Sequence, residues 1–408
     1  DNERALRAVL LSQLWETFQQ TPVTKEDVSS LLYSLVGLTN TEDEIDEGIG
    51  ASCLALVESC LRASLAADIG MSTSGTAATA AILSSLFRAT TLFNASDTQS
   101  LRYASNATSI LRLVSTAQLR HGFPGGAGFR MDGDLIDMIS YRNYAAALGS
   151  EGVTVEVEHD AATATRAVFS GLSSADFKIP EDSSVDIKVV IFGTDIYKYS
   201  FKGSAGTREA EDWNGKGSED MGLAIKLRSN PTLVEISPYS SMTPMVIKDL
   251  SLGNAIRITL PVKAPFAFNT SSKTFLRNRA CNHTGQVHIL NCPLDPEKAH
   301  TCNLQIHGDG NPYMFDFKCP ILEPTCLTWD DYSGQFLDSG TCEVLDGYLP
   351  HEVTCACTLL AGSPIALGST TRDEIFIPQK PTSQPSPVPS LAPLPDPTVL
   401  PTPLPTPV

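Results

Sequence analysis

Eight of the ten cysteines lie between Cys281 and Cys357, and the last two form a Cys-x-Cys pair. Two residues at this spacing on a strand project to the same face of a sheet, so each cysteine needs a partner on a neighbouring strand. An even number of cysteines, clustered in β-type sequence, is typical of a disulfide framework formed in an oxidising compartment. The cluster therefore predicts a secreted chain whose C-terminal strands are held by disulfides.

Four N-glycosylation sequons agree with a secretory route. Their acceptor residues are Asn94, Asn106, Asn269 and Asn282. The tripeptide is common by chance, so the sequons carry weight only together with the cysteine cluster and a proline-rich C-terminal segment. Together these three features predict an extracellular glycoprotein.

Composition limits the classes of function. The 408 residues are 42% hydrophobic and 18% charged, so the chain has enough apolar content to bury a core. A net charge of −17 repels phosphate, and we expect no nucleic acid binding. No run of about 18 apolar residues is evident, so we expect no membrane span. Since no signal peptide is visible at Asp1, we expect a mature or excised part of a longer protein.

Residues 1–122 have a helical hydrophobic period and predict a small bundle. Pro22 should end the first helix, and Thr24-Lys-Glu-Asp27 resembles a capping box that starts a second helix ending at Gly37. Glu42-Asp43-Glu44 should form the first turn of a third helix, because carboxylates there interact favourably with the positive end of the helix dipole. The third helix is expected at 41–67, and further helices at 76–91 and 98–119.

Residues 123–150 are expected to be a connecting region, because glycine and proline dominate His121–Gly128. From residue 151 the hydrophobic period changes to two, as at Val153, Val155 and Val157. Short strands separated by turn residues predict an antiparallel β-sandwich over residues 151–368. The expected strands are 185–192, 223–227, 233–236, 255–262, 287–290 and 314–317.

A proline-rich tail is expected over residues 377–408. Twelve of the 27 prolines lie between Pro378 and Pro407, where no cysteine, glycine or aromatic residue occurs. Such a segment favours an extended polyproline II strut, with serine and threonine as O-glycan sites. We expect it to mediate self-association or contact with other extracellular subunits. The expected fold class is therefore α+β: a helical bundle, a β-sandwich with disulfide-pinned C-terminal strands, and a polyproline II tail.

The segment 326–366 carries the most specific pattern in the chain. It contains, in order, Cys326, Trp329-Asp330, Gly340-Thr-Cys342 and Cys355-Ala-Cys357. This order resembles the GPS motif that ends a GAIN domain in adhesion receptors and polycystin-type proteins. Phe336 stands where a second tryptophan is usual, and Thr341 is an extra residue between glycine and cysteine. Helices followed by a β-sandwich are also the order of a GAIN domain, so the resemblance spans Asp1 to about Gly368.

The resemblance implies a disulfide pairing and a position for self-cleavage. In GAIN-like modules the four cysteines pair first with third and second with fourth, which implies Cys326–Cys355 and Cys342–Cys357. Trp329 would be a large packing anchor beside these bridges. The family cleaves itself when a histidine deprotonates a threonine or serine, whose oxygen attacks the preceding leucine carbonyl.

The catalytic residues of that family are missing here. The aligned positions are Leu359, Leu360 and Ala361, which offer neither a base nor a hydroxyl. Ser363 has no adjacent histidine, and His351 precedes the Cys-x-Cys pair. We therefore expect no self-cleavage and no other enzymatic activity.

Four further cysteines lie in histidine-containing sequence. Cys281, His283, His288 and Cys292 are metal-ligand types, but we prefer a disulfide because an exported chain oxidises its thiols. Cys302 and Cys319 are symmetric about the turn at 308–311, which predicts a cross-strand bridge. No metal or other cofactor is expected, since the aspartates at 132, 134, 137 and 309 complete no calcium-binding pattern.

Cys53 and Cys60 lie seven residues apart on an expected helix, about 10 Å along its axis. A straight helix cannot bridge them. Three possibilities stay open: the helix breaks, the thiols remain reduced in the core, or they pair with something outside.

Two function classes fit these features. The first is a non-enzymatic structural or adhesion glycoprotein, a subunit of a filament, flagellar hair or cell-surface coat. Its Pro-rich segment resembles spacers in cell-surface proteins of algae and protists and in flagellar hair (mastigoneme) proteins. The second is the ectodomain of a polycystin-like or adhesion-type receptor whose membrane part lies beyond residue 408. Either function places the chain outside the cell, at a cell or flagellar surface.

Overall fold

A computed structural model describes residues 2–20, 23–92, 97–150, 152–160, 163–173, 176, 178–193, 227–239, 241–263, 275–292, 297–319, 321–349, 351–372 and 375–379. The chain divides into two compact units. Unit 1 consists of Asp1–Asn269 and Leu322–Arg372, and unit 2 of Thr270–Ile321 and Asp373–Val408. The expected α+β class is confirmed: helices are followed by antiparallel sheets with disulfides among the C-terminal strands.

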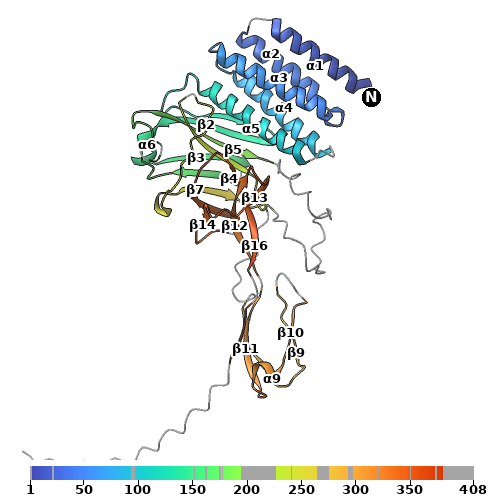
Figure 1. The fold of residues 1–408 in the computed structure, drawn as a ribbon, viewed down its shortest axis with the longest axis vertical. Coiled ribbons are helices and arrows are strands. Elements are labelled where there is room, and N and C mark those ends of the chain that lie inside the picture. Colours follow the sequence, from blue (N-terminus) through green and yellow to red (C-terminus); the bar gives the residue numbers. More distant parts are fainter. Residues whose placement is uncertain are drawn as a thin grey trace, which may run out of the picture. The chain divides into compact units, whose positions relative to one another are not determined.

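Unit 1 begins with a stack of long helices, coloured blue to cyan in Figure 1. Helix α2 contacts α4, α3 contacts α5, and α1 contacts α3, while α4 and α5 also contact the first strands of the sheet. The helices are α1 (Asn2–Gln20), α2 (Lys25–Thr39), α3 (Glu47–Ala66), α4 (Thr73–Leu92) and α5 (Asp97–Leu119).

The expected cap of α2 is confirmed. The Thr24 hydroxyl accepts a hydrogen bond from the backbone N–H of Asp27 at 3.2 Å. This bond satisfies one of the N–H groups that a helix start leaves without a partner.

The third helix starts later than expected. Glu42–Glu44 form a short 3-10 turn, and α3 begins at Glu47, where the Asp46 side chain accepts from the N–H of Ile49 at 2.8 Å. The carboxylates in the turn pair with arginines of other helices, Glu42 with Arg88 and Glu44 with Arg7. These acidic residues therefore connect helices instead of opening one.

The β part of unit 1 is a sandwich of two antiparallel sheets. The first, a seven-stranded sheet, has the order β1-β2-β5-β6-β16-β12-β13, and the second, a five-stranded sheet, has the order β14-β15-β7-β4-β3. In the first sheet the bounds are β1 (Phe129–Asp132), β2 (Ile136–Tyr144), β5 (Ser184–Phe192), β6 (Thr232–Pro238), β16 (Pro364–Arg372), β12 (Ile321–Asp330) and β13 (Gln335–Leu337). In the second they are β14 (Cys342–Val344), β15 (Glu352–Cys357), β7 (Ile256–Pro261), β4 (Thr163–Phe169) and β3 (Val153–Asp160).

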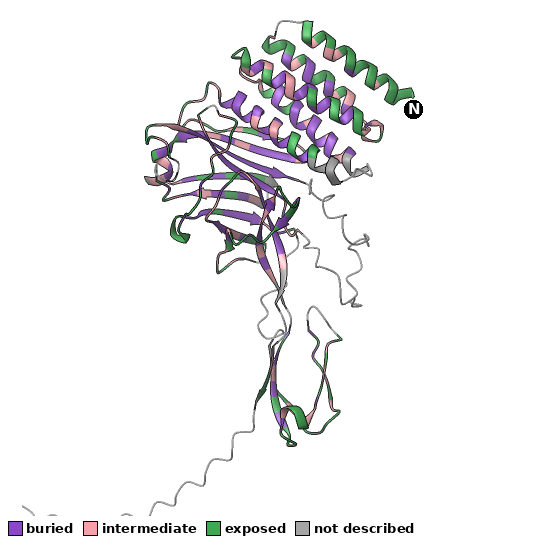
Figure 2. Ribbon diagram, in the orientation of Figure 1, coloured by how far each residue is buried: buried purple, intermediate pink, exposed green. Residues whose placement is uncertain are grey.

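Both faces of the seven-stranded sheet are covered, which makes most of its inner strands buried (Figure 2). On β5, Ile187 and Val189 pack into the core between the two sheets, whereas Val190 and Phe192 pack into the core shared with the helices. Phe192 meets Phe87 of α4 edge to face at 6.3 Å between ring centres. The unit is thus three layers: helices, a two-faced sheet and a second sheet.

One expectation about the β region was wrong, namely where its first strands begin. Residues 123–150 are not only a connection, since they contain β1, β2 and the short helix α6 (Ala145–Ser150). Strand β2 pairs along its whole length with β5, from Ile136 opposite Phe192 to Tyr144 opposite Ser184. The other strand expectations agree with β5, β6 and β7, whereas 223–226 lie outside the described residues.

Unit 2 is a small β module with its own core. A three-stranded sheet has the order β17-β11-β8, and a two-stranded sheet consists of β10 and β9. The elements are β8 (Phe275–Cys281), β9 (Val287–Ile289), β10 (Ala299–Thr301), α9 (Leu304–His307), β11 (Tyr313–Lys318) and β17 (Ile375–Gln379). Its core combines four half-cystines with Leu290, Tyr313, Phe315 and Phe317.

The expected tail overlaps with β17. Ile377 and Pro378 lie opposite Asp316 and Phe315 of β11, so the first residues of the range 377–408 belong to a strand. Because β17 is an edge strand, Pro378 is tolerated there without an N–H donor. Residues 380–408, on which the polyproline II expectation rests, lie outside the described residues.

Within the described residues, one helix is long and apolar enough to cross a bilayer. This helix is α3, with a mean hydropathy of 1.4 and half of its apolar window buried in the helical core. Its partners there are α1, α2, α4 and α5. A core helix of a folded domain passes the same test of length and composition.

Candidate functional site

The segment that resembles a GPS motif carries two disulfides, one between the two sheets and one within the five-stranded sheet. Cys326 of β12 is bonded to Cys355 of β15, and Cys342 of β14 to Cys357 of β15, the pairing that the resemblance implies. Since β12 belongs to the seven-stranded sheet and β15 to the five-stranded one, Cys326–Cys355 crosses the sandwich. The second bridge joins the adjacent strands β14 and β15, where Cys342 lies opposite Cys357.

Trp329 packs on the opposite face of β12 from the disulfides, which corrects the expectation that it lies beside them. Successive residues of a strand alternate between faces, so positions 326 and 329 point opposite ways. Cys326 faces the core between the sheets, whereas Trp329 and Phe336 face the helical side. The two rings are cross-strand partners 5.2 Å apart, and the Trp329 indole N–H donates to Asp331 at 2.9 Å.

The position that would carry cleavage is an ordinary loop between β15 and β16. Leu360 is buried and exchanges two backbone hydrogen bonds with Ile247, of 2.8 and 2.9 Å. Leu359 is half-buried and Ala361 is exposed. Gly362 has a φ of +72°, and a Cβ there would meet Pro244 at 3.0 Å and the Glu235 carboxylate at 3.1 Å.

The histidine nearest to this loop in sequence, His351, lies one whole strand away from it. His351 directly precedes β15, whose six residues span about 20 Å in the extended form. The Thr358 hydroxyl is committed to the backbone carbonyl of Thr341 at 3.2 Å. The four cysteines and the tryptophan of the motif are therefore present. The loop at the cleavage position, however, has neither a base nor a nucleophile at the aligned residues.

A buried ladder of charges links α5 to the sheet. Glu235 of β6, 1% exposed at its side chain, accepts from Arg112 of α5 at 2.9 Å and from Lys188 of β5 at 3.1 Å. One row further along the same sheet face, Arg142 of β2 forms a two-pronged pair with Asp186 of β5, at 2.6 and 2.9 Å. Burial lowers the pKa of Lys188, and Glu235 opposes this shift. Sequence reasoning missed the ladder, because charges on alternate strand positions suggest a solvent-exposed face.

The disulfides of unit 2 differ from the expected ones. Cys281 is bonded to Cys302 and Cys292 to Cys319. A bridge between Cys302 and Cys319 was expected because they seemed to flank one hairpin, but β10 pairs with β9 and not with β11. Helix α9 and its following turn separate β10 from β11 in the chain.

A cluster of half-buried histidines packs against the core of unit 2 beside these bridges. The His300 ring stacks on Phe376 at 4.5 Å, meets Phe315 at 4.5 Å and lies 6.1 Å from His307. Its Nε2 is 3.2 Å from the Tyr313 hydroxyl. His288 lies near the sulfurs of Cys281 and Cys302, but these are bonded to each other and so do not bind a metal as thiolates.

The cluster should make unit 2 sensitive to acid. Burial, then the proximity of His307 and His288, lowers the pKa of His300 below its ordinary value of 6.5. A folded-state pKa below the unfolded one means that the unfolded chain binds more protons in acid. The stability that neutral His300 supports is therefore intact above pH 6.5 and lost as the pH falls below it.

We expect His300→Phe to reduce this acid sensitivity. Protection of the β10 and β11 amides, measured by hydrogen exchange and corrected for the intrinsic pH dependence of the exchange rate, should fall from neutral to acidic pH in the parent chain and fall less in the variant. His283→Phe is the matched control, because His283 is exposed in the same unit. An equal loss of protection in the parent and in His300→Phe would show that other groups cause the response.

The remaining cysteines are free thiols. Cys53 and Cys60 are fully buried on the unbroken helix α3. Burial raises the pKa of each thiol to about 12. Of the three possibilities left open by the sequence, the structure has the second: both stay reduced in the core.

Two of the glycosylation acceptors lie in described residues, and both are exposed. Asn106 lies on α5 and Asn282 directly follows β8. Asn94 and Asn269 lie outside the described residues. Two of the four aspartates considered for calcium form ion pairs, Asp134 with Arg88 and Asp132 with Arg130.

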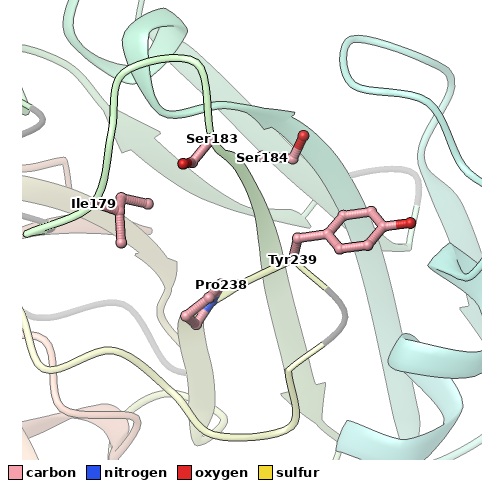
Figure 3. A pocket seen from close by; sticks show the side chains of 5 residues that line it. All are labelled: Ile179, Ser183, Ser184, Pro238 and Tyr239. Atoms are coloured by element: carbon pink, nitrogen blue, oxygen red, sulfur yellow. The ribbon is translucent and has the colours of Figure 1, made fainter.

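An open pocket lies at the end of the seven-stranded sheet, where β5 begins and β6 ends (Figure 3). Its volume is about 450 Å³, and its lining is Ile179, Ser183, Ser184, Pro238 and Tyr239. The lining has two hydroxyl groups and one phenol but no charged or metal-ligating side chain. Its chemistry suits an uncharged, partly apolar group.

We compared the chain with known proteins. Neither protein-family models nor curated proteins gave a match. The likeness to a GAIN domain therefore stays a prediction that rests on the residues of the segment 326–366.

Proposed function

We propose that the chain is a non-enzymatic structural subunit of an extracellular filament, flagellar hair or cell-surface coat. The observation that carries the proposal is the contrast within one segment: the disulfide frame that resembles a GPS motif is complete, but its cleavage position holds Leu359, Leu360 and Ala361. Disulfides that are present without the residues for self-cleavage serve to stabilise the fold.

An extracellular setting is supported by the disulfides. Eight half-cystines form four bridges, and such bridges persist in oxidising compartments. The exposed acceptors Asn106 and Asn282 are consistent with N-glycans on the same surface. The Pro-rich sequence after β17 suits a spacer or a contact between subunits.

We expect the native chain to be intact across Leu360–Ala361, because these positions lack the hydroxyl and base that an acyl shift requires. Denaturing electrophoresis of native protein should show one band under reducing conditions. Two fragments that separate at this bond would refute the absence of cleavage. Mass spectrometry of the peptide that spans residues 358–363 provides the matching positive signal.

Electron microscopy of the native material tests the proposed function itself. A regular fibre or lattice that contains this chain supports a structural subunit. Two results together would favour a receptor ectodomain instead: a monodisperse particle, and a gene that encodes a run of about 20 apolar residues after residue 408.

A further inference from the structure

Three exposed aromatic residues of unit 1 lie on elements that Arg142 joins; we call them the aromatic patch. They are Phe123, Tyr144 and Tyr239, with 81%, 48% and 56% of their surface exposed. Large aromatic side chains usually bury most of their area, so a group of three exposed rings indicates a binding surface.

Arg142 fixes the elements that carry the patch. Its guanidinium lies 4.2 Å from the centre of the Tyr239 ring and donates to the carbonyl of Gly122 at 3.0 Å. Its own carbonyl accepts from the N–H of Gly125 at 2.9 Å, which holds the loop of Phe123. Because Asp186 neutralises the guanidinium, the patch is built on a paired charge and is itself uncharged.

The two tyrosines have a defined spacing. Tyr144 lies opposite Ser184 of β5, and the carbonyl of Ser184 accepts from the N–H of Tyr239 at the end of β6. Two strand spacings therefore separate the tyrosine backbones, about 9.5 Å. One turn of a polyproline II helix, three residues, is about 9.3 Å long. A Pro-rich strand that crosses β2, β5 and β6 would place residues one turn apart over the two tyrosines.

The chain itself contains such a strand. Residues 381–408 hold eleven prolines interspersed with leucine, valine, serine and threonine, and Asp396 is their only charged side chain. Aromatic grooves bind Pro-rich segments because the polyproline II form is already extended and loses little entropy on binding. Its free carbonyls can accept from the tyrosine hydroxyls. The pocket beside Tyr239 has room for a prolyl or leucyl side chain (Figure 3).

We propose that the aromatic patch binds the Pro-rich segment 381–408 of a second copy of this chain. The proposal rests on the proposed structural function and names the surface through which subunits join. The segment is almost uncharged, which matches the uncharged patch. Up to 28 residues at about 3.1 Å each give it a reach of about 87 Å, enough to span from one subunit to the next.

The test uses the full chain and measures its self-association by analytical ultracentrifugation. Tyr144→Ala should weaken association at least about tenfold, because truncation of a central aromatic contact is the costliest kind at an interface. Tyr332→Ala is the matched control, since Tyr332 is fully exposed elsewhere on the same unit. A synthetic peptide of residues 381–408 should dissociate the parent assembly, and the same peptide with alanine for proline should not.

The outcomes separate this proposal from the proposed function. Association of Tyr144→Ala at parental strength, with the peptide without effect, would overturn the patch as the acceptor even if native filaments exist. If the peptide binds but the parent chain stays monomeric at every concentration, the bound Pro-rich segment does not come from a second copy of this chain. Tyr144→Phe, which keeps a ring at this position, should associate more tightly than Tyr144→Ala, and thermal unfolding of Tyr144→Ala at the parental temperature excludes a folding defect as the cause.

Discussion

Glu235→Ala should destabilise unit 1 by about 3–5 kcal/mol, the usual cost of removing one partner of a buried ion pair. The change leaves Lys188 with 5% of its side chain exposed and without its carboxylate, and it also disconnects Arg112 of α5. The reason is electrostatic: a charge that has left water needs a partner, because the protein interior solvates it poorly. Urea unfolding, followed by circular dichroism, measures the loss.

The pH dependence of the loss identifies its cause. Burial already lowers the pKa of Lys188 from its ordinary 10.5, and loss of Glu235 removes the group that opposes this shift. In the variant the folded-state pKa falls further, so the unfolded chain binds more protons over a wider range. Its stability should therefore rise with pH more steeply than that of the parent, and the difference should shrink from neutral pH towards 10.5.

Two further variants serve as controls for Glu235→Ala. Glu156→Ala removes an exposed partner of Arg166 and should change stability little. A double change, Lys188→Met with Glu235→Met, should recover much of the loss, because apolar residues of similar volume replace a buried ion pair at little cost. A loss in Glu235→Ala no larger than in Glu156→Ala would contradict the role of the ladder.

The same ladder explains why β2 was not expected from the sequence. Its residues Asp137, Arg142 and Asn143 interrupt the alternation of apolar and polar residues that predicts a strand. Arg142 is buried because the helices cover its face of the sheet, and Asp186 of β5 is its partner. Asp137 points to the opposite face and accepts from the N–H of Gly133. Hydrophobic periodicity therefore predicts β5, because the other face of that strand is purely aliphatic, but it does not predict the neighbouring strand β2.

The helices were predictable because each has a continuous apolar stripe and local end signals. The Thr24 cap and the buried positions Val28, Leu31, Leu32 and Leu35 of α2 depend only on residues close in sequence. The start of α3 has a local signal as well, the Asp46 cap, but the acidic residues before it were assigned to the helix. Their place in a separate turn, paired with Arg7 and Arg88, depends on residues far away in the chain.

The disulfides show the same division. The pairing around β15 was implied by a resemblance, whereas that of unit 2 was inferred from symmetry about a turn and was wrong. Strands of three residues, such as β9 and β10, are too short to predict their partner from sequence. The pairing of Cys281 with Cys302 follows only once β9 is seen to pair with β10.

Removing the bridge between the two sheets is the second change with a large expected effect. Cys326→Ala together with Cys355→Ala should lower the stability of unit 1 by about 2–5 kcal/mol, because the bridge closes a loop across the sandwich and restricts the unfolded chain. Its half-cystines are 29 residues apart in sequence and lie in the buried core between the sheets. Thermal unfolding, monitored by calorimetry, measures the effect.

The response to reductant separates the disulfide from the packing of its side chains. Reduction should destabilise the parent chain strongly and the double variant less, since one bridge is already absent there. Cys53→Ala and Cys60→Ala remove buried sulfurs that form no bridge, so their smaller losses should be the same with and without reductant. If the double variant were as stable as these controls, the cross-sheet bridge would not hold β15 to β12.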